Sequence, residues 1–380
     1  MRSAAVGYFF RLWISRDKFI CRKNYYGILL IFLGACAHSL KDKSDLALTP
    51  QDFDQKIEAI PEADYKSVEI DYTAVKKPEK QVDETVELRK MLGKVSLETP
   101  SKTKKAKQVT KKEPATPALD SKQWVPVGWP FGIGEKITLV LRYGPLEGGI
   151  ATLEVNEPQS VNGDMVLHYR GTVKSSKVLD LFYKVNDEMD SWVGISDHLP
   201  RRQEIKQLES SHWGKRVVVF NQKNQHARYF AHTTYKDGHE EDIRREDEMT
   251  PFAQDVLGAL FFYRFAPDLK RINFPVHDRF RNWANELTYL GTETIQVPAG
   301  EFETIHYKMF PRVSGELAPK GDVDFWVKND SSRVVVQFKA KIKVGSITGE
   351  LKEYVPGVPP KLAPPLMKTP CDMASQTASK

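Results

Sequence analysis

The sequence predicts a mainly β protein: a curved antiparallel sheet that forms a barrel or half-barrel with one or two apolar helices, preceded by a disordered tether. Three observations support this fold class. Apolar and polar residues alternate with a period of two over much of residues 128–354, as they do in half-buried strands. Turn signals such as Asn162-Gly163 and Pro298-Ala299-Gly300 separate these runs. Two apolar segments break the period and are expected to be helical.

The first element in chain order is a lipoprotein signal peptide, expected over residues 1–35. Two basic residues precede a short apolar run at 25–33. This run cannot cross a bilayer, which takes roughly 20 apolar residues, but it suits the hydrophobic region of a secretory signal. Leu33-Gly34-Ala35-Cys36 resembles the bacterial lipobox. The resemblance implies cleavage before Cys36 and lipid on its sulfur; an ordinary signal with an accidental cysteine is the alternative.

The residue after Cys36 indicates where the anchored protein resides. Ala37 stands where an Asp would resemble an inner-membrane retention signal. We therefore expect a protein of the bacterial cell envelope, lipid-anchored in the outer membrane and facing the periplasm. The membrane is its first expected partner.

A linker is expected over residues 36–127, because this segment is rich in Lys, Glu, Pro, Ser and Thr and has no sustained apolar period. Such a chain cannot bury enough surface to offset its conformational entropy. As a flexible coil it has a root-mean-square end-to-end distance of roughly 50 Å, by the square-root rule for flexible linkers. It carries lysines that could contact an anionic surface, although a solvated charge run is the favoured interpretation: Lys102, Lys104, Lys105, Lys107, Lys111 and Lys112.

The distribution of charge argues against a nucleic acid partner. The chain has 56 basic and 50 acidic residues, a net charge of +6. Residues 1–35 hold six of the basic and one of the acidic residues, so the remainder has 50 and 49 and a net charge of +1. A nearly neutral chain does not attract a polyanion, and no aromatic residues are interleaved among the linker lysines.

The β-rich domain is expected over residues 128–354 and contains about a dozen candidate strands. The clearest alternate over residues 136–143, 151–155, 322–328 and 333–340. The charged stretch 237–248 lacks the oxygen-ligand spacing of a calcium loop and is expected to be a solvated loop.

Two helices are expected within this domain. A short one covers Val178 to Phe182, and a longer one begins with Thr250 as N-cap and Pro251 as its first residue and runs to about Phe265. The longer helix is apolar on nearly every side, so it must be covered by the sheet. We expect its apolar residues to form a groove or lid: Phe252, Val256, Leu257, Leu260 and Phe261.

The tail, residues 355–380, is rich in proline and is expected to be disordered. It holds Cys371, a lone thiol. With Cys21 and Cys36 this makes three cysteines, all outside the predicted domain, so we expect neither a disulfide framework nor a cysteine metal site.

Several motifs of the domain resemble domain-of-unknown-function family 3108, a group of β-rich bacterial envelope lipoproteins. The most specific is the turn Pro298-Ala299-Gly300-Glu301-Phe302. The others are Gly134-Glu135-Lys136, Tyr143-Gly144-Pro145, Asp324-Phe325-Trp326-Val327 and Gly349-Glu350-Leu351. The resemblance covers most of residues 130–354 and implies a β-rich fold, but no established activity or catalytic residues.

No motif in the chain indicates a reaction, a cofactor or a metal. There is no His-Glu-x-x-His, no Gly-x-Ser-x-Gly and no phosphate loop. His226 and His232 flank one strand and are interpreted as solvated. Asp322 and Asp324 share a strand face as paired catalytic carboxylates would, yet alternation alone gives the same spacing.

The leading hypothesis is therefore a non-enzymatic envelope lipoprotein that binds a lipid or other amphiphile in a groove of the sheet. The alternative is an envelope scaffold or assembly factor that binds a protein or wall polymer. A hydrolase using Asp322 and Asp324 is the third and least favoured hypothesis. A continuous apolar cavity would support the first, a filled interior the second, and converging polar groups the third.

Overall fold

The computed structural model describes residues 55–60, 121–266, 271–313, 316–317, 323–341 and 345–370, all within one compact unit. Its main feature is one antiparallel sheet of sixteen strands, and a second sheet has two. The mainly β class predicted from the period of two is therefore confirmed.

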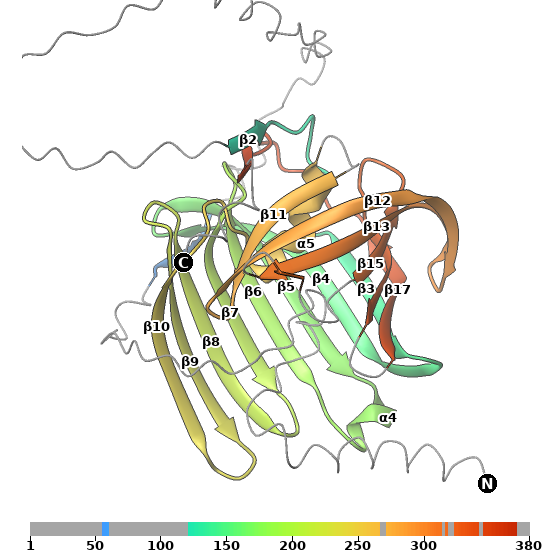
Figure 1. The fold of residues 1–380 in the computed structure, drawn as a ribbon, viewed down its shortest axis with the longest axis horizontal. Helices are drawn as coiled ribbons and strands as arrows, with labels where there is room; N and C mark the ends of the chain where they lie inside the picture. The colour runs from blue at the N-terminus through green and yellow to red at the C-terminus, as the bar shows by residue number, and fades with distance from the viewer. Residues whose placement is uncertain are drawn as a thin grey trace, which may run out of the picture. The chain divides into compact units, whose positions relative to one another are not determined.

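The first half of the large sheet is a meander in which each strand pairs with the next. In Figure 1 these strands stand side by side as a broad, largely flat wall. They are β3 (Lys136–Tyr143), β4 (Leu146–Val161), β5 (Asp164–Ser175), β6 (Asn186–Gly194), β7 (Pro200–Leu208), β8 (His212–Asn221), β9 (His226–Tyr235) and β10 (Glu240–Glu248). The short β1 (Ile57–Ala59) pairs with β4.

The second half of the sheet joins the first half through β3. Its last long strand, β17, pairs with β3, so that Leu351 lies opposite Leu139. The order then runs from β17 through β16, β15, β13 and β12 to β11. The bounds are β11 (Arg271–Asp278), β12 (Arg281–Val297), β13 (Gly300–Val313), β15 (Val323–Lys328), β16 (Val335–Lys341) and β17 (Ser346–Val355), with β14 (Glu316–Leu317) beside β13.

The core lies between these two halves. Alternate residues of the strands point into it: Leu139 and Leu141 of β3 and Val323, Phe325 and Val327 of β15 are all buried. In Figure 1, β11 to β13 cross in front of the wall with a helix between them and it. The alternation seen in the sequence thus identifies the face that each strand buries.

Within the described residues there are two helical segments at the predicted places, but the longer one begins later than expected. α4 (Lys177–Asp180) joins β5 to β6, and α5 (Val256–Phe262) continues into a 3-10 turn, η5 (Tyr263–Phe265). The predicted start at Thr250 is wrong. Phe252 has a φ of 61°, which is incompatible with a helix, and Asp255 is the N-cap.

The predicted closed barrel is wrong, because the end strands of the large sheet, β10 and β11, do not pair; the sheet is open and its first half is largely flat. The open edge of β11 is occupied instead. Gln254 donates to Pro275 O at 2.9 Å and accepts from His277 N at 2.9 Å, and Thr369 Oγ1 donates to Asn273 O at 2.7 Å. These contacts fill the positions that another strand would need for closure.

The stretch expected to be a solvated loop, residues 237–248, mostly forms the other edge strand, β10. Several of its charged side chains have partners in the fold. Tyr235 donates to Glu241 at 2.9 Å, and Arg245 donates to Asp247 and lies 4.8 Å from the ring centroid of Phe280. Charged residues are common on edge strands, where they discourage pairing with other chains.

The predicted disorder of the tail is wrong for residues 355–370, which we call the C-terminal strap. Its last residues form β18 (Met367–Pro370), which pairs with β2 (Ser121–Trp124), so the folded part also starts earlier than residue 128. Met367 is fully buried. Proline has no backbone N–H to donate, but the backbone carbonyls of the strap can still accept hydrogen bonds. Trp129 Nε1, for example, donates to Leu362 O at 2.7 Å.

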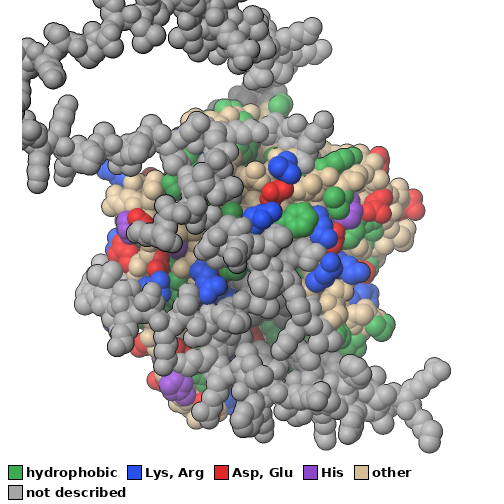
Figure 2. All heavy atoms as spheres, in the orientation of Figure 1, with side chains coloured by type: hydrophobic (Ala, Val, Ile, Leu, Met, Phe, Trp, Pro, Cys, Tyr) green, Lys and Arg blue, Asp and Glu red, His purple; other side chains and the backbone are tan. Residues whose placement is uncertain are grey.

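Cys36, Cys371, the linker lysines and residues 61–120 lie outside the described residues, so the predictions about them stand untested. Among the helices that the structure does describe, none has the length and apolarity needed to cross a membrane. Figure 2 shows Lys and Arg interspersed with Asp and Glu on the visible face.

Candidate functional site: an apolar hollow beside helix α5

Helix α5 lies between the two halves of the sheet. It contacts β5 and β6 on one side and β11 on the other. Val256, Leu257 and Phe261 are buried, and the ring of Phe261 stacks on Tyr169 of β5 with centroids 4.1 Å apart. The helix is thus part of the core, as its apolar sequence requires.

A small hollow remains where α5 faces the second half of the sheet. Its lining is entirely apolar or aromatic: Ala259, Leu260, Tyr263, Phe274, Leu287, Tyr307, Met309, Phe325 and Val327. The space between atoms, open mouth included, is about 360 Å³. The enclosed part has room for only about one or two water molecules. The hollow therefore suits a small apolar group without any rearrangement.

The N-terminal end of α5 is held by buried polar groups. Asp255 Oδ1 accepts from Gly258 N at 2.7 Å, and Oδ2 accepts from the Ser191 hydroxyl. Beside it, His198 Nδ1 contacts Gln254 Oε1 at 3.2 Å and Nε2 contacts the Tyr169 hydroxyl at 3.0 Å. Burial raises the pKa of Asp255 to about 6 and lowers the pKa of His198 to about 4, so His198 is neutral at pH 7.

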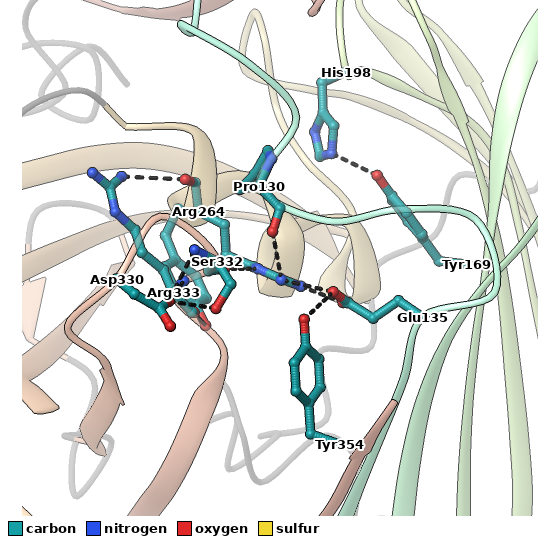
Figure 3. A network of polar contacts seen from close by, with 10 residues as sticks. Pro130, Glu135, Tyr169, His198, Arg264, Asp330, Ser332, Arg333 and Tyr354 are labelled. Atoms are coloured by element: carbon teal, nitrogen blue, oxygen red, sulfur yellow. Dashed lines mark hydrogen bonds and ion pairs between the residues drawn. The ribbon is translucent and has the colours of Figure 1, made fainter. Parts of the chain in front are cut away.

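The C-terminal end is held by a buried ion pair, shown in Figure 3. Arg264, in η5, donates to Glu135 Oε1 at 2.6 Å and to Oε2 at 3.0 Å. Both residues are at most 3% exposed. Arg264 also donates to Pro130 O at 3.0 Å and Ser332 O at 2.8 Å, and Tyr354 donates to Glu135 at 3.2 Å.

This arrangement is a clamp rather than a reactive centre. The guanidinium and the carboxylate satisfy each other in bidentate geometry. Together with the three groups around them, they come from four separate segments of the chain. The clamp therefore fixes the end of α5, and with it Tyr263 and Leu260, against the lining of the hollow.

The predicted groove residues divide into three groups. Leu260 lines the hollow. Val256, Leu257 and Phe261 are packed into the core instead and do not line it. Phe252 lies in the turn before the helix. Periodicity predicted an apolar helix but could not show which face the second half of the sheet leaves uncovered.

The residues considered for catalysis do not converge. Asp322 lies outside the described residues, and Asp324 contacts His306 Nε2 at 3.0 Å. His226 and His232 are six residues apart on β9, about 20 Å by the rise of a strand. Within the described ranges no three His, Cys, Asp or Glu side chains are grouped so that they could hold a metal ion.

The groups that hold α5 were not predicted from the sequence. Glu135 and Arg264 are 129 residues apart, so no local pattern joins them. One signal was present: Arg264 interrupts the run Phe261-Phe262-Tyr263-Arg264-Phe265, and a charge within such a run needs a partner when buried. Asp255, four residues after Pro251, was the better capping signal.

A second buried acidic cluster lies at the end of the wall near α4. Asp187 of β6 accepts from Leu208 N at 3.1 Å and lies close enough to Glu209, which follows β7, for each carboxyl group to affect the pKa of the other. Tyr183 donates to Glu209 and lies 2.6 Å from Ser211 Oγ. Burial raises the pKa of both carboxyl groups, to about 6 for Asp187 and about 7 for Glu209. The pair therefore tends to share a proton near neutral pH.

Comparison with known proteins identifies a family but no characterised relative. A family model described as protein of unknown function (DUF3108) matches residues 138–352. No match was found among curated proteins.

Three solved structures show low similarity. A β-barrel-like DUF1849 protein from Brucella abortus has 8% identity and a TM-score of 0.38, over 60% of this chain and 99% of that one. A presumed exported protein with a YmcC-like fold from Bacteroides fragilis NCTC 9343 has 10% identity and a TM-score of 0.28, over 61% of this chain and 100% of that one. A presumed lipoprotein from Parabacteroides distasonis ATCC 8503 has 9% identity and a TM-score of 0.26, over 60% of this chain and 99% of that one.

Proposed function

The chain belongs to the DUF3108 family, whose function is unknown. We propose that it is a non-enzymatic lipoprotein of the bacterial cell envelope and that it binds the apolar part of an amphiphile beside α5. The observation that carries the proposal is the hollow, whose lining has no charged side chain. Such a site attracts apolar groups because each buried CH₂ contributes about 0.8 kcal/mol.

The size of the hollow sets the kind of ligand. Because its enclosed space holds only about one or two water molecules, the hollow can accommodate the end of an acyl chain. A longer segment of the chain would require the lining side chains to move. Leu260 is only partly buried, and Met309 has a flexible side chain that refills gaps at low cost. We expect these two side chains to move when a chain enters.

The surroundings favour an acidic headgroup. Arg333 lies next to the hollow, because the hydroxyl of Tyr263, which lines it, donates to Arg333 O at 3.2 Å. Its guanidinium donates to Arg264 O at 3.2 Å, near the end of α5. A fatty acid, with one carboxylate and one acyl chain, matches an apolar hollow with a cation beside it.

The test uses the mature full-length chain and a fluorescent fatty acid. Leu260→Trp should fill the hollow and weaken binding by about tenfold, equivalent to about 1.4 kcal/mol or the burial of two CH₂ groups. Leu290→Trp is the matched control, because Leu290 is 52% exposed on β12 and does not line the hollow. Circular dichroism should show that both variants fold.

The alternative, an envelope scaffold or assembly factor, predicts a different result. A folded wild-type protein that neither binds the probe nor carries co-purifying lipid by native mass spectrometry would contradict amphiphile binding. Equal binding by wild type and Leu260→Trp would place the ligand elsewhere.

A further inference from the structure

Five large apolar side chains are exposed together at one end of the wall, apart from the hollow. We call them the rim patch: Val178, Leu181 and Phe182 at α4, and Leu208 and Trp213 at the turn between β7 and β8. Their exposed fractions are 55%, 80%, 45%, 51% and 47%. Scattered exposed apolar residues are ordinary, but a contiguous group rimmed by polar residues marks an interaction surface.

Hydrogen bonds between residues adjoining the two parts of the rim patch hold these parts next to each other. Lys184 N donates to Ser210 Oγ at 2.8 Å, and Ser210 N donates to Lys184 O at 3.0 Å. Leu208 and Trp213 are cross-strand partners. Since alternate turns of a meander lie at the same end, α4 and the β7–β8 turn form one surface, and Figure 1 shows α4 at this end of the wall.

Three basic residues flank the α4 part of the patch. Lys174, Lys177 and Lys184 are exposed, and none of them forms an ion pair with any residue that the structure describes. Their nearest acidic neighbour in sequence, Asp180, accepts a hydrogen bond from Ser175. The segment 174–184 therefore has three positive charges and one negative charge.

We propose that the rim patch is a membrane-contact surface that inserts its apolar side chains into the interface of an anionic lipid bilayer. Trp and Phe are favoured at the boundary between headgroups and acyl chains. Lysines at the same depth reach the headgroups along their apolar stems and contribute about 1 kcal/mol each near an anionic surface.

The size and charge of the patch favour a bilayer over a protein. A stable protein interface usually involves about 20 to 30 residues on each side, whereas a few apolar side chains with flanking lysines suffice for reversible contact with lipid. A second copy of the chain would bring the same lysines and would be repelled.

The experiment must remove the other expected membrane contacts. The starting protein is the mature full-length chain with Cys36→Ser, which prevents lipidation, and with the six linker lysines at 102, 104, 105, 107, 111 and 112 changed to Gln. Its binding is measured by co-sedimentation with vesicles of phosphatidylglycerol and phosphatidylethanolamine, and with vesicles of phosphatidylcholine.

We expect binding to the anionic vesicles that is at least fivefold stronger than to phosphatidylcholine. The double substitution Leu181→Asp and Phe182→Asp should weaken it at least tenfold. The matched control is Val127→Asp with Leu290→Asp, because these residues are 81% and 52% exposed outside the patch. Control binding should equal that of the starting protein.

A fluorescence measurement locates the contact. Brominated phosphatidylglycerol should quench tryptophan emission, and Trp213→Phe should remove most of the quenching. Equal binding by the patch and control variants, or quenching unchanged by Trp213→Phe, would overturn the proposal. So would a lipid-free dimer that Leu181→Asp with Phe182→Asp converts to a monomer, since the occupant would then be a second copy.

Discussion

At the scale of single residues, the pair of Glu135 and Arg264 is the most consequential polar contact of the core. Each charge is almost completely removed from water, and each is stable there only because the other is present. The pair also connects the start of β3 to the end of α5. Its loss should therefore affect both stability and the position of the hollow's lining.

We predict that Arg264→Met lowers the free energy of unfolding by about 3–5 kcal/mol, because Glu135 is left buried without a counter-ion. Arg264→Met combined with Glu135→Leu should recover much of this loss, since no charge then remains buried. Urea unfolding measures both. Lys206→Met, which breaks an exposed pair with Glu188, is the control and should cost less than about 1 kcal/mol. A loss below 1 kcal/mol for Arg264→Met would contradict the clamp.

The Asp187 and Glu209 pair gives the domain a pH dependence. Both carboxyl groups have raised pKa values in the folded state because they are buried, so the folded protein holds protons that the unfolded chain releases. Their contribution to stability is complete below about pH 4 and is lost as the pH rises through about 6 to 7. His212, 4.0 Å from Glu209, has a pKa lowered by burial and acts in the opposite direction.

Glu209→Gln should remove much of this dependence, because the amide mimics the protonated acid at every pH. Between pH 5 and pH 8 we expect the wild type to lose about 1–2 kcal/mol more than the variant, since one pKa unit corresponds to about 1.4 kcal/mol. Urea unfolding at pH 5, 6, 7 and 8 measures the difference. Glu240→Gln, at an exposed position on β10, should follow the wild type. Parallel curves for the wild type and Glu209→Gln would refute the shared-proton interpretation.

At the scale of elements, the C-terminal strap shows how a proline-rich segment can become part of a fold. Its prolines exclude a helix, but the strap is held by contacts that need few donors of its own. Ile133 and Val358 form two backbone bonds of 2.8 Å, and Leu366 N donates to Ser196 O at 2.9 Å. The strap thus contacts the first and second halves of the sheet as well as β2.

Deletion of residues 357–380 should lower the melting temperature by roughly 10 °C. It removes the buried Met367 and the β2–β18 pair, worth a few kcal/mol in total, and each kcal/mol shifts a domain of this size by about 2–4 °C. Deletion of residues 371–380 alone is the matched control. Differential scanning fluorimetry that finds the two truncated chains equally stable would show that the strap adds nothing.

At the scale of the whole molecule, those features of the fold that depend on local sequence pattern could be predicted from the sequence. Strand faces follow from alternation, which is why Leu139, Leu153 and Phe325 are buried as expected. The closure of the sheet could not be predicted in this way. It depends on which residues occupy the edges: Gln254 reaches β11 from the turn before α5, and Thr369 reaches it from the C-terminal strap.

The same limit applies to the candidate site. The apolar sequence of α5 predicted a covered helix with Leu260 among its possible groove residues. The hollow itself arises from nine residues on six elements, and the clamp from partners 129 residues apart. Periodicity reports the environment of one segment, whereas these features depend on tertiary contacts.

The pairing of β3 with β17 also determines when the domain can fold. Arg142 of β3 and its partner Glu350 of β17 are 208 residues apart. Likewise, β2 can pair only after β18 has emerged. A chain that emerges amino terminus first, from a ribosome or a translocation channel, therefore exposes one edge of β3 until almost its last residues appear. Contacts of such long sequence separation slow folding, so the nascent domain stays open to proteases and chaperones until synthesis or export is nearly complete.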